Sequence, residues 1–270
     1  MAGKARWQAP PKVFTDARTK AQALALEAVV RDVVGVPEGE VLMSAMHWRQ
    51  KPEYPASKQQ AWRALLCGTY RSLNDFNAGF VEVGLHRRDY PKSLRLAAAV
   101  VARRQFVECL FEWSRLLCSR LVEVVWSGSE KGLGLRAKTT LHEYTQLDEL
   151  VGRLIRISAL DLARLKKRNL DHAVVHRTFG KRPDGTPARS EWSVCVGPLA
   201  LINGACKEHA NVQTFIERTA ESAAALERQR AATDYKRVQV KPGCIVRQGE
   251  ELLVHYGDGY NVPCAVCGAM

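Results

Sequence analysis

The sequence of 270 residues predicts an α+β fold in which a helical N-terminal half precedes a β-rich C-terminal half. Up to about residue 125 the apolar residues recur at helical spacing. After the turn WSGSEKGLG at 126–134, short alternating runs are separated by loops rich in glycine, proline and charge. We therefore expect a boundary near 127–131 and three parts: a helical domain over 1–127, a β-rich domain over 128–260 and a cysteine-containing tail over 261–270.

Three helices are expected in the N-terminal half, each marked by a residue that favours a helix start. They are a helix over 16–34 capped by Asp16, a helix from Lys58 capped by Ser57, and a long helix over 91–125 opened by Pro91.

The C-terminal half is expected to hold short strands joined by turns. The segment KRPDGTPARS at 181–190 is typical of an exposed hairpin, and TAESAAALERQRAATDY at 219–235 has the composition of an inserted helix. The expected strands cover 192–196, 212–216, 237–240 and 252–256.

The balance of charge favours an acidic partner, because 40 Lys and Arg outnumber 28 Asp and Glu. The most apolar long segment, 94–125, contains eight charged residues, too many for a membrane span, and no apolar run typical of a secretion signal follows the N-terminus. We expect a soluble intracellular protein whose eight cysteines are reduced thiols or metal ligands. Cys67, Cys109 and Cys118 lie in apolar helical patterns and are expected to pack in the core.

Three segments of the C-terminal half carry a resemblance to a known family. They are KGLGLRA at 131–137, LINGAC at 201–206, and GEELLVHYGDGY at 249–260 with a following Cys-x-x-Cys. In this order they resemble SET-domain protein lysine methyltransferases, most of all the subclass that methylates core-histone tails and carries a helical bundle before its SET core. The resemblance covers 131–267 and implies an N-terminal helical bundle, a SET-type β-fold with a threaded (pseudoknot) loop, a short post-SET tail and a nuclear location.

The resemblance also implies the site residues. Tyr256 falls on the catalytic tyrosine, and the residues implied to contact S-adenosyl-L-methionine are Lys131, Gly132, Leu133, Gly134, Asn203, Gly204 and Tyr256. By themselves Gly132 and Gly134 are typical of a turn, a dinucleotide-binding (Rossmann) loop is a further alternative for this segment, and Asn203 could instead tie a loop. The walls of a lysine channel, or ordinary core, are expected from Leu201, Ile202, Trp192 and Tyr260.

Two departures from the family pattern lie close together. Gly204 stands where the family has histidine, and Glu208-His209 stands where it has Pro-Asn. Because the family residue contacts adenine mainly through its backbone, we expect cofactor binding to survive with glycine but to be weakened, and Gly204→His to tighten it or leave it unchanged.

A zinc site is the third implied feature. Cys206, Cys264 and Cys267 match three of the family's four post-SET cysteines. A tetrahedral structural zinc needs a fourth ligand, for which the candidates are His209, Cys244, His255 or a water molecule.

Taken together, the sequence predicts an S-adenosylmethionine-dependent protein lysine N-methyltransferase. The expected partners are a histone tail or another basic protein tail, and the nucleosome, with no membrane. The alternative is a catalytically weak SET-like domain that binds chromatin or nucleic acid through its basic surface.

Overall fold

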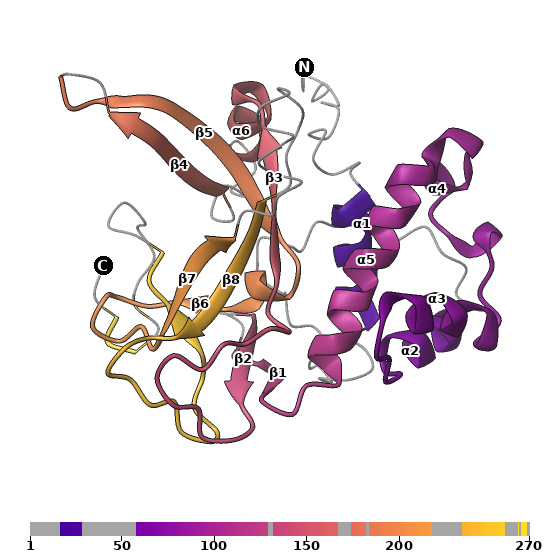
Figure 1. Ribbon diagram of the computed structural model, residues 1–270, viewed down its shortest axis with the longest axis horizontal. Coiled ribbons are helices and arrows are strands. Elements are labelled where there is room, and N and C mark those ends of the chain that lie inside the picture. Colours follow the sequence, from indigo (N-terminus) through magenta and orange to yellow (C-terminus); the bar gives the residue numbers. More distant parts are fainter. Residues whose placement is uncertain are drawn as a thin grey trace, which may run out of the picture.

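The computed structural model describes residues 17–28, 58–128, 132–166, 174–181, 184–217 and 234–256, together with residues 264 and 266–268. Helices α1 to α5 gather on one side of the molecule and the strands on the other, with α6 beside the strands (Figure 1). Within these residues no helix is long and apolar enough to cross a membrane. The helices are α1 (Ala17–Ala28), α2 (Gln59–Leu66), α3 (Leu73–Glu82), η4 (Arg87–Asp89), α4 (Lys92–Arg95), η5 (Ala97–Ala99), α5 (Val100–Leu117), α6 (Ala159–Lys166) and η7 (Pro198–Leu201). The strands are β1 (Val122–Trp126), β2 (Leu133–Ala137), β3 (Gly152–Ile157), β4 (Val174–Lys181), β5 (Pro187–Val196), β6 (Asn203–Gly204), β7 (Val212–Glu217), β8 (Asp234–Val240) and β9 (Leu253–Val254).

Helix α5 is the centre of the helical side, where α1, α2 and α3 pack against it. Its Trp113 is fully buried, and the indole N–H donates to the side chain of Gln22 on α1 at 2.8 Å. Trp62 of α2 meets Phe106 of α5 edge to face, with ring centroids 6.1 Å apart. Such contacts between large rings contribute much of the burial that holds short helices in place.

The expected helix over 91–125 was wrong in its second part. Pro91 caps α4, a break follows at Leu96, and α5 ends at Leu117. The following residues form strand β1, which pairs antiparallel with β2 from Val122↔Ala137 to Trp126↔Leu133. Pairing with a strand later in the chain therefore makes residues 122–126 a strand and not a helix. The expected boundary near 127–131 falls between these two paired strands.

The other expected helices are described in part. Helix α1 covers 17–28 of the expected 16–34, and α2 begins directly after Lys58. Asp16, Ser57 and residues 29–34 lie outside the described residues.

A seven-stranded mixed sheet forms the other side, in the order β4-β5-β3-β8-β7-β9-β6. Strand β9 runs parallel to both β6 and β7, while the remaining neighbours are antiparallel. The strands expected over 192–196, 212–216 and 237–240 are confirmed within β5, β7 and β8, and the hairpin expected over 181–190 joins β4 to β5. The strand expected over 252–256 is shorter, and comprises only Leu253–Val254.

The helix expected over 219–235 was wrong at its end, because Asp234 and Tyr235 belong to strand β8. The rest of that segment, residues 219–233, lies outside the described residues.

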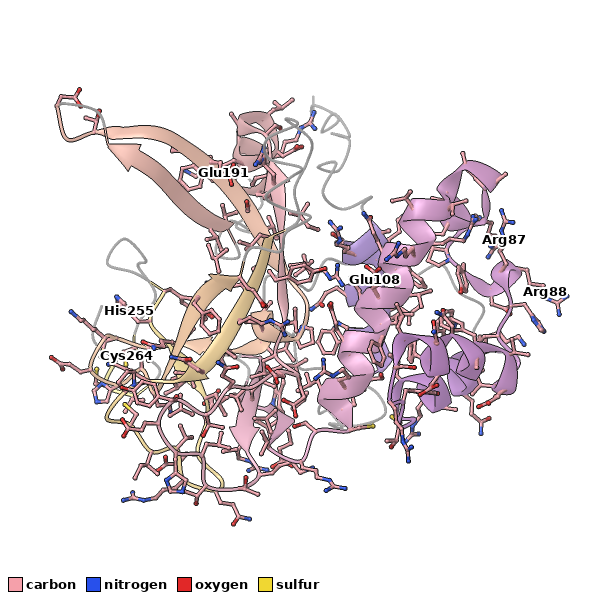
Figure 2. The ribbon with its side chains drawn as sticks, viewed as in Figure 1. Arg87, Arg88, Glu108, Glu191, His255 and Cys264 are labelled. Atoms are coloured by element: carbon pink, nitrogen blue, oxygen red, sulfur yellow. The ribbon has the colours of Figure 1, made fainter. Side chains whose placement is uncertain are left out.

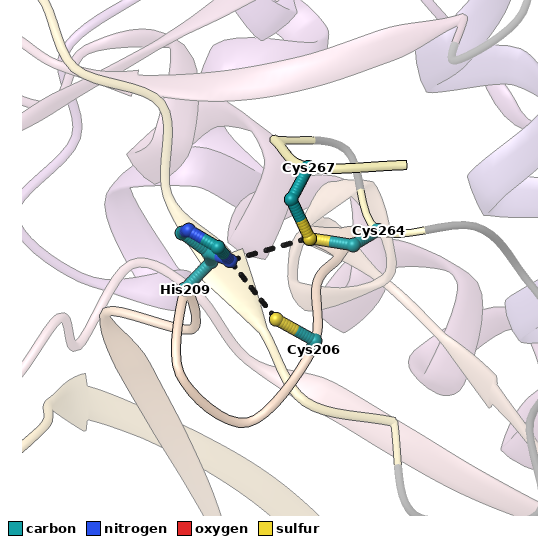
Figure 3. A group of neighbouring side chains, drawn as sticks. All are labelled: Cys206, His209, Cys264 and Cys267. Carbon is teal, nitrogen blue, oxygen red and sulfur yellow. Dashed lines mark hydrogen bonds between the residues drawn. The ribbon is translucent and has the colours of Figure 1, made fainter. Parts of the chain in front are cut away.

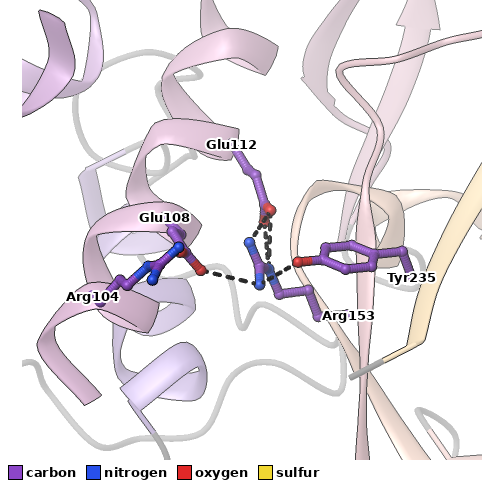
Figure 4. A network of polar contacts seen from close by, with 5 residues as sticks. All are labelled: Arg104, Glu108, Glu112, Arg153 and Tyr235. Carbon is purple, nitrogen blue, oxygen red and sulfur yellow. Dashed lines mark hydrogen bonds and ion pairs between the residues drawn. The ribbon is translucent and has the colours of Figure 1, made fainter. Parts of the chain in front are cut away.

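The two sides share one hydrophobic core and a buried ion-pair network (Figure 4). Arg153 of β3 is only 5% exposed and donates to Glu112 of α5 at 2.6 Å and to the hydroxyl of Tyr235 of β8 at 3.0 Å. Its guanidinium also lies 3.4 Å from Glu108. Burial raises the pKa of Glu112, and the charge of Arg153 opposes that shift. Helix α5 is thereby fixed to the middle of the sheet.

Candidate functional site

A tight turn brings the segment 197–204 to the edge of the sheet. Gly197 has φ of +114°, and a Cβ there would lie 2.7 Å from the carbonyl oxygen of Val151. The chain then passes through η7 into β6, where Asn203 pairs with Leu253 and Gly204 with Val254 of β9. Two segments about fifty residues apart in the sequence therefore lie side by side.

Glu251 lies where these two segments meet the β1–β2 hairpin. Its Oε1 accepts hydrogen bonds from the amide of Asn203 at 2.7 Å and the hydroxyl of Ser127 at 2.9 Å. The amide of Asn203 also approaches the carbonyl oxygen of Leu133 at 3.4 Å. The Asn203 side chain thus links β6 to β2 and to Glu251, two residues before β9, while its side-chain oxygen accepts no hydrogen bond from the described residues.

The glycines of the Gly-x-Gly segment have different physical roles. Gly132 has φ of +74° and closes the turn after β1, where its N–H donates to Gly128 at 2.7 Å. Gly134 is needed for space, because a Cβ there would overlap the Glu251 carboxylate and the Ser127 hydroxyl. Leu133 between them is 1% exposed, so only its backbone faces the Asn203 amide. Lys131 lies outside the described residues.

Tyr256 follows β9 and reaches back over β6. Its hydroxyl donates to the carbonyl oxygen of Ile202 at 2.5 Å, directly before Asn203. The residue is 45% exposed, yet desolvation around the hydroxyl raises its pKa well above the usual value for tyrosine. The phenol therefore stays protonated at neutral pH and keeps its hydrogen on the Ile202 carbonyl.

Gly204 lies directly under the ring of Tyr256, and a Cβ at this position would overlap Cδ2 and Cε2 of the ring. A histidine at position 204 would therefore have to displace the Tyr256 ring, and the effect of Gly204→His on cofactor affinity stays a prediction. Any side chain at this position must displace Tyr256, and the glycine is coupled to the tyrosine that the sequence singled out.

A second cluster lies beside this loop and joins it to the C-terminal segment (Figure 3). The turn after Cys206 places Nδ1 of His209 2.9 Å from the Cys206 sulfur and 3.7 Å from the Cys264 sulfur. With Cys267 these residues offer four ligand atoms, all within 4.8 Å of one another. Tetrahedral zinc, with Zn–S near 2.3 Å and Zn–N near 2.0 Å, separates its ligands by about 3.5–3.8 Å. The cluster has the size and the donors for such an ion.

The protonation of Cys264 also suits a metal ligand. The residue is buried, and backbone hydrogen bonds from Cys206 and Cys267 lower the pKa of its thiol to about 6. The N–H of Val266 donates to the same sulfur at 3.4 Å. A thiol with this pKa is largely thiolate at neutral pH, the form that binds metal.

Of the three expected alternatives for a fourth ligand among the side chains, the structure brings His209 to the three cysteines. Cys244 packs against the main hydrophobic core, and Nδ1 of His255 lies 3.4 Å from the carbonyl oxygen of Ala205. His255 and Cys264 lie at the same edge of the molecule (Figure 2).

The residues expected to line a lysine channel are divided by the fold. Leu201 and Ile202 are both 2% exposed and belong to the core beneath Asn203. Trp192 packs with Ile157 and Leu165 in a separate cluster on the α6 side of β5. Tyr260 lies outside the described residues.

Sequence reasoning missed Glu251, Ser127 and Asn211. Glu251 is the second glutamate of the Gly-Glu-Glu motif, so the motif itself could have identified it. Asn211 donates to the Glu251 carbonyl oxygen and accepts from the Leu253 N–H, both at 2.8 Å. No local pattern distinguishes Asn211 from other loop asparagines.

Comparison with known proteins gives partial structural likenesses. No family model and no curated protein matches the sequence. A solved structure titled for the product specificity of histone lysine methyltransferases has 16% identity and a TM-score of 0.37 over 56% of this chain and 55% of that one. The Neurospora SET domain protein DIM-5, a histone lysine methyltransferase, has 15% identity and a TM-score of 0.35 over 53% and 55%. The ATXR5 SET domain in complex with histone H3 has 12% identity and a TM-score of 0.35 over 65% and 73%. The chain spans about half the length of the first two.

Proposed function

We propose that this protein is an S-adenosylmethionine-dependent protein lysine N-methyltransferase of the SET type that acts on a histone tail or another basic protein tail in the nucleus. One observation carries the proposal. The three segments that resemble the family, separated by about seventy and fifty residues, meet around Glu251, with Asn203 bound to it and Tyr256 packed over Gly204. Unrelated loops have no reason to converge in this way.

The methyl donor would be held by the backbone of 131–134 and by Asn203 and Gly204. Asn203 uses its N–H groups on Glu251 and Leu133, which leaves its side-chain oxygen to accept a hydrogen bond from the donor's ammonium group. The Glu251 carboxylate adds negative charge beside a ligand that carries positive charge on both its ammonium and its sulfonium. The donor set therefore fits this ligand.

The bound donor supplies a methyl group that its sulfonium already activates, so this chain mainly has to hold and orient the reactants. Tyr256 donates its hydroxyl hydrogen to the carbonyl oxygen of Ile202, and its phenolic oxygen would accept contacts from polarised C–H or N–H groups of the reactants. An apolar channel at this site would disfavour an ammonium ion. A substrate lysine, with a usual pKa of about 10.4, would lose its proton more readily there.

Zinc is the second part of the proposal, with Cys206, His209, Cys264 and Cys267 as its four ligands. The ion would fix the segment after Tyr256 to the loop that carries Asn203 and Gly204. Its role would be structural, because four protein ligands leave no open position for a substrate.

The test is methyl transfer from labelled S-adenosylmethionine to core histones and to nucleosomes by the full chain. Tyr256→Phe should lower turnover by on the order of a hundredfold or more while cofactor affinity changes little, because only an orienting hydroxyl is lost. Tyr144→Phe is the matched control, since Tyr144 is 58% exposed and its substitution should leave turnover unchanged.

Unchanged turnover of Tyr256→Phe would mean that the active site has been misplaced. Tight binding of nucleosomes by the wild-type protein with no methyl transfer would favour the alternative, a SET-like binding domain.

A further inference from the structure

A groove on the helical side lies on the far side of the molecule from the candidate site. It has a volume of about 280 Å³ and lies between α3 and α5. Its floor is apolar, formed by Leu73, Val107 and the ring of Tyr90, and its rim is polar, formed by Asn77, Arg103 and Arg104. The corner next to it carries Arg87 and Arg88, which project away from the rest of the protein (Figure 2).

Each of the two helices carries a further exposed aliphatic residue at helical spacing from its groove-lining residues. On α5, Val100 precedes Arg103, Arg104 and Val107 at the spacing of one helix face and is 62% exposed. On α3, Val81 follows Leu73 and Asn77 at the same kind of spacing and is 69% exposed. Leu96 and Val101, also largely exposed, add to this apolar surface. Exposed aliphatic side chains on the elements that line a groove favour protein binding there.

The arginines of this corner donate hydrogen bonds to backbone carbonyl oxygens. Arg87 donates to the carbonyl oxygen of Arg95 at 2.5 Å, Arg95 to that of Tyr90 at 2.7 Å, and Arg103 to that of Leu96 at 2.7 Å. The corner's own carboxylate, Asp89, is buried and accepts from the N–H of His86 at 2.8 Å.

The arginines of the sheet side differ. Every arginine after residue 132 whose side chain the structure describes forms an ion pair with a carboxylate. These are Arg136, Arg153, Arg156, Arg164, Arg237 and Arg247. Arg87, Arg95 and Arg103, which lie beside α4, therefore form no ion pair with a described carboxylate. Arg104 differs, because it pairs with Glu108 at 2.9 Å.

We propose that the groove between α3 and α5 binds an acidic amphipathic segment of a partner protein, with aliphatic side chains on its floor and carboxylates against Arg87, Arg95, Arg103 and Arg104. Arginine forks match carboxylates well, and an apolar groove between two helices suits the apolar face of a third. A nucleic-acid backbone would satisfy the cations but would leave Val81, Leu96, Val100 and Val101 without apolar partners, so the mixed chemistry favours a protein. The proposal is independent of methyl transfer.

The experiment uses the full chain and a fluorescein-labelled helical peptide of about 18 residues, five helical turns, with leucines on one face and glutamates elsewhere. Fluorescence anisotropy should give a dissociation constant on the order of 10 µM. A scrambled peptide of the same composition, which has no apolar face, should bind at least about tenfold more weakly because it cannot fill the floor of the groove.

The variant Val100→Ser/Arg104→Ala should weaken binding of the helical peptide by at least about tenfold. Leu160→Ser/Arg164→Ala is the matched control, since it removes an exposed aliphatic residue and an ion-paired arginine four residues apart on α6. It should leave binding within about twofold of the wild type. Lys92→Glu, an exposed change at the same corner, is a second test that should weaken binding severalfold.

Circular dichroism and thermal unfolding establish that each variant is folded. The proposal is overturned if the scrambled peptide binds equally well, if the helical peptide does not bind, or if both double variants lose the same affinity. It is also overturned if duplex DNA of about 20 base pairs binds through these residues while the peptide does not.

Discussion

The ring of Tyr256 packs directly on the Cα of Gly204, in space that a Cβ would occupy. Its hydroxyl, bound to Ile202, depends on that contact for its position. The absence of a side chain at position 204 therefore helps to determine the orientation of Tyr256.

Gly204→Ala should lower methyl transfer by about tenfold or more, because the added methyl group pushes the tyrosine ring aside and moves the hydroxyl. Its melting temperature should change little, since the ring is half exposed and can move outward. Steady-state kinetics and a thermal melt check both statements.

Gly243→Ala provides the control. It has open space around the added methyl group but φ of +72°, so it should cost about 1 kcal/mol of folding free energy and leave turnover unchanged. Equal turnover of Gly204→Ala and the wild type would show that Tyr256 is not placed by this contact.

Glu251→Gln should weaken the binding of S-adenosylmethionine by at least about tenfold and destabilise the fold by about 1–3 kcal/mol. The substitution preserves shape but removes the charge that accepts from both Asn203 and Ser127. Calorimetric titration and denaturant unfolding measure the two effects.

Glu250→Gln is the adjacent control, because the Glu250 side chain is exposed and interacts with Arg247, whose backbone N–H donates to it at 2.9 Å and whose guanidinium lies 3.8 Å away. It should leave cofactor affinity unchanged. Equal cofactor affinity of the two variants would show that Glu251 does not contribute to cofactor binding.

Metal analysis of the purified chain should give about one zinc per molecule. His209→Ala should release the ion, whereas His209→Cys should retain it, because a thiolate can replace the imidazole in a tetrahedral site. Cys244→Ser should also retain zinc, since Cys244 packs against the core away from the cluster. A full zinc content in His209→Ala would exclude the histidine as a ligand.

Zinc should be retained at neutral pH and lost at acidic pH, because the fold lowers the pKa of a ligand thiol. In the folded chain Cys264 has a pKa of about 6, below that of an ordinary thiol. Its thiolate and the stabilisation it brings are present above the unfolded value and are lost as pH falls through about 6. Dialysis at a series of pH values should show zinc loss beginning below that point and not in the range from 7 to 8.

Much of the sheet was predictable because its strands alternate apolar and polar residues within short bounded runs, as 192–196 and 212–216 do. Strand β1 was not, because VEVVW follows an amphipathic helix without a proline or glycine, and only its pairing with β2 reveals it. Tyr235 was similarly assigned to a helix, although in the structure it bonds to Arg153 across the sheet.

The candidate site shows the same division. Asn203, Tyr256 and the cysteines were identified from motifs, while the choice of His209 among three possible ligands required the turn that follows Cys206. The overlap between position 204 and the Tyr256 ring joins residues about fifty positions apart, and no local pattern encodes such a contact.

Glu112→Gln should destabilise the protein by roughly 3 kcal/mol, because it leaves the buried guanidinium of Arg153 without its closest charged partner. The matched control is Glu123→Gln in the exposed pair with Arg136, where the cost should be below about 1 kcal/mol. Denaturant unfolding of both variants measures the difference. Equal stability losses would mean that the buried network does not fix α5 to the sheet.

A fragment beginning at Ser127 should be insoluble or unfolded. It lacks β1, which pairs with β2 over five residues, and it lacks Glu112, the partner of Arg153. It would also expose the apolar side chains of the sheet side that pack against α5 in the shared core. A fragment beginning at Asp16 keeps every described element and should remain soluble. Gel filtration and circular dichroism of the two fragments decide the question, and a soluble, cooperatively unfolding fragment from Ser127 onward would show that the helical half is an independent module.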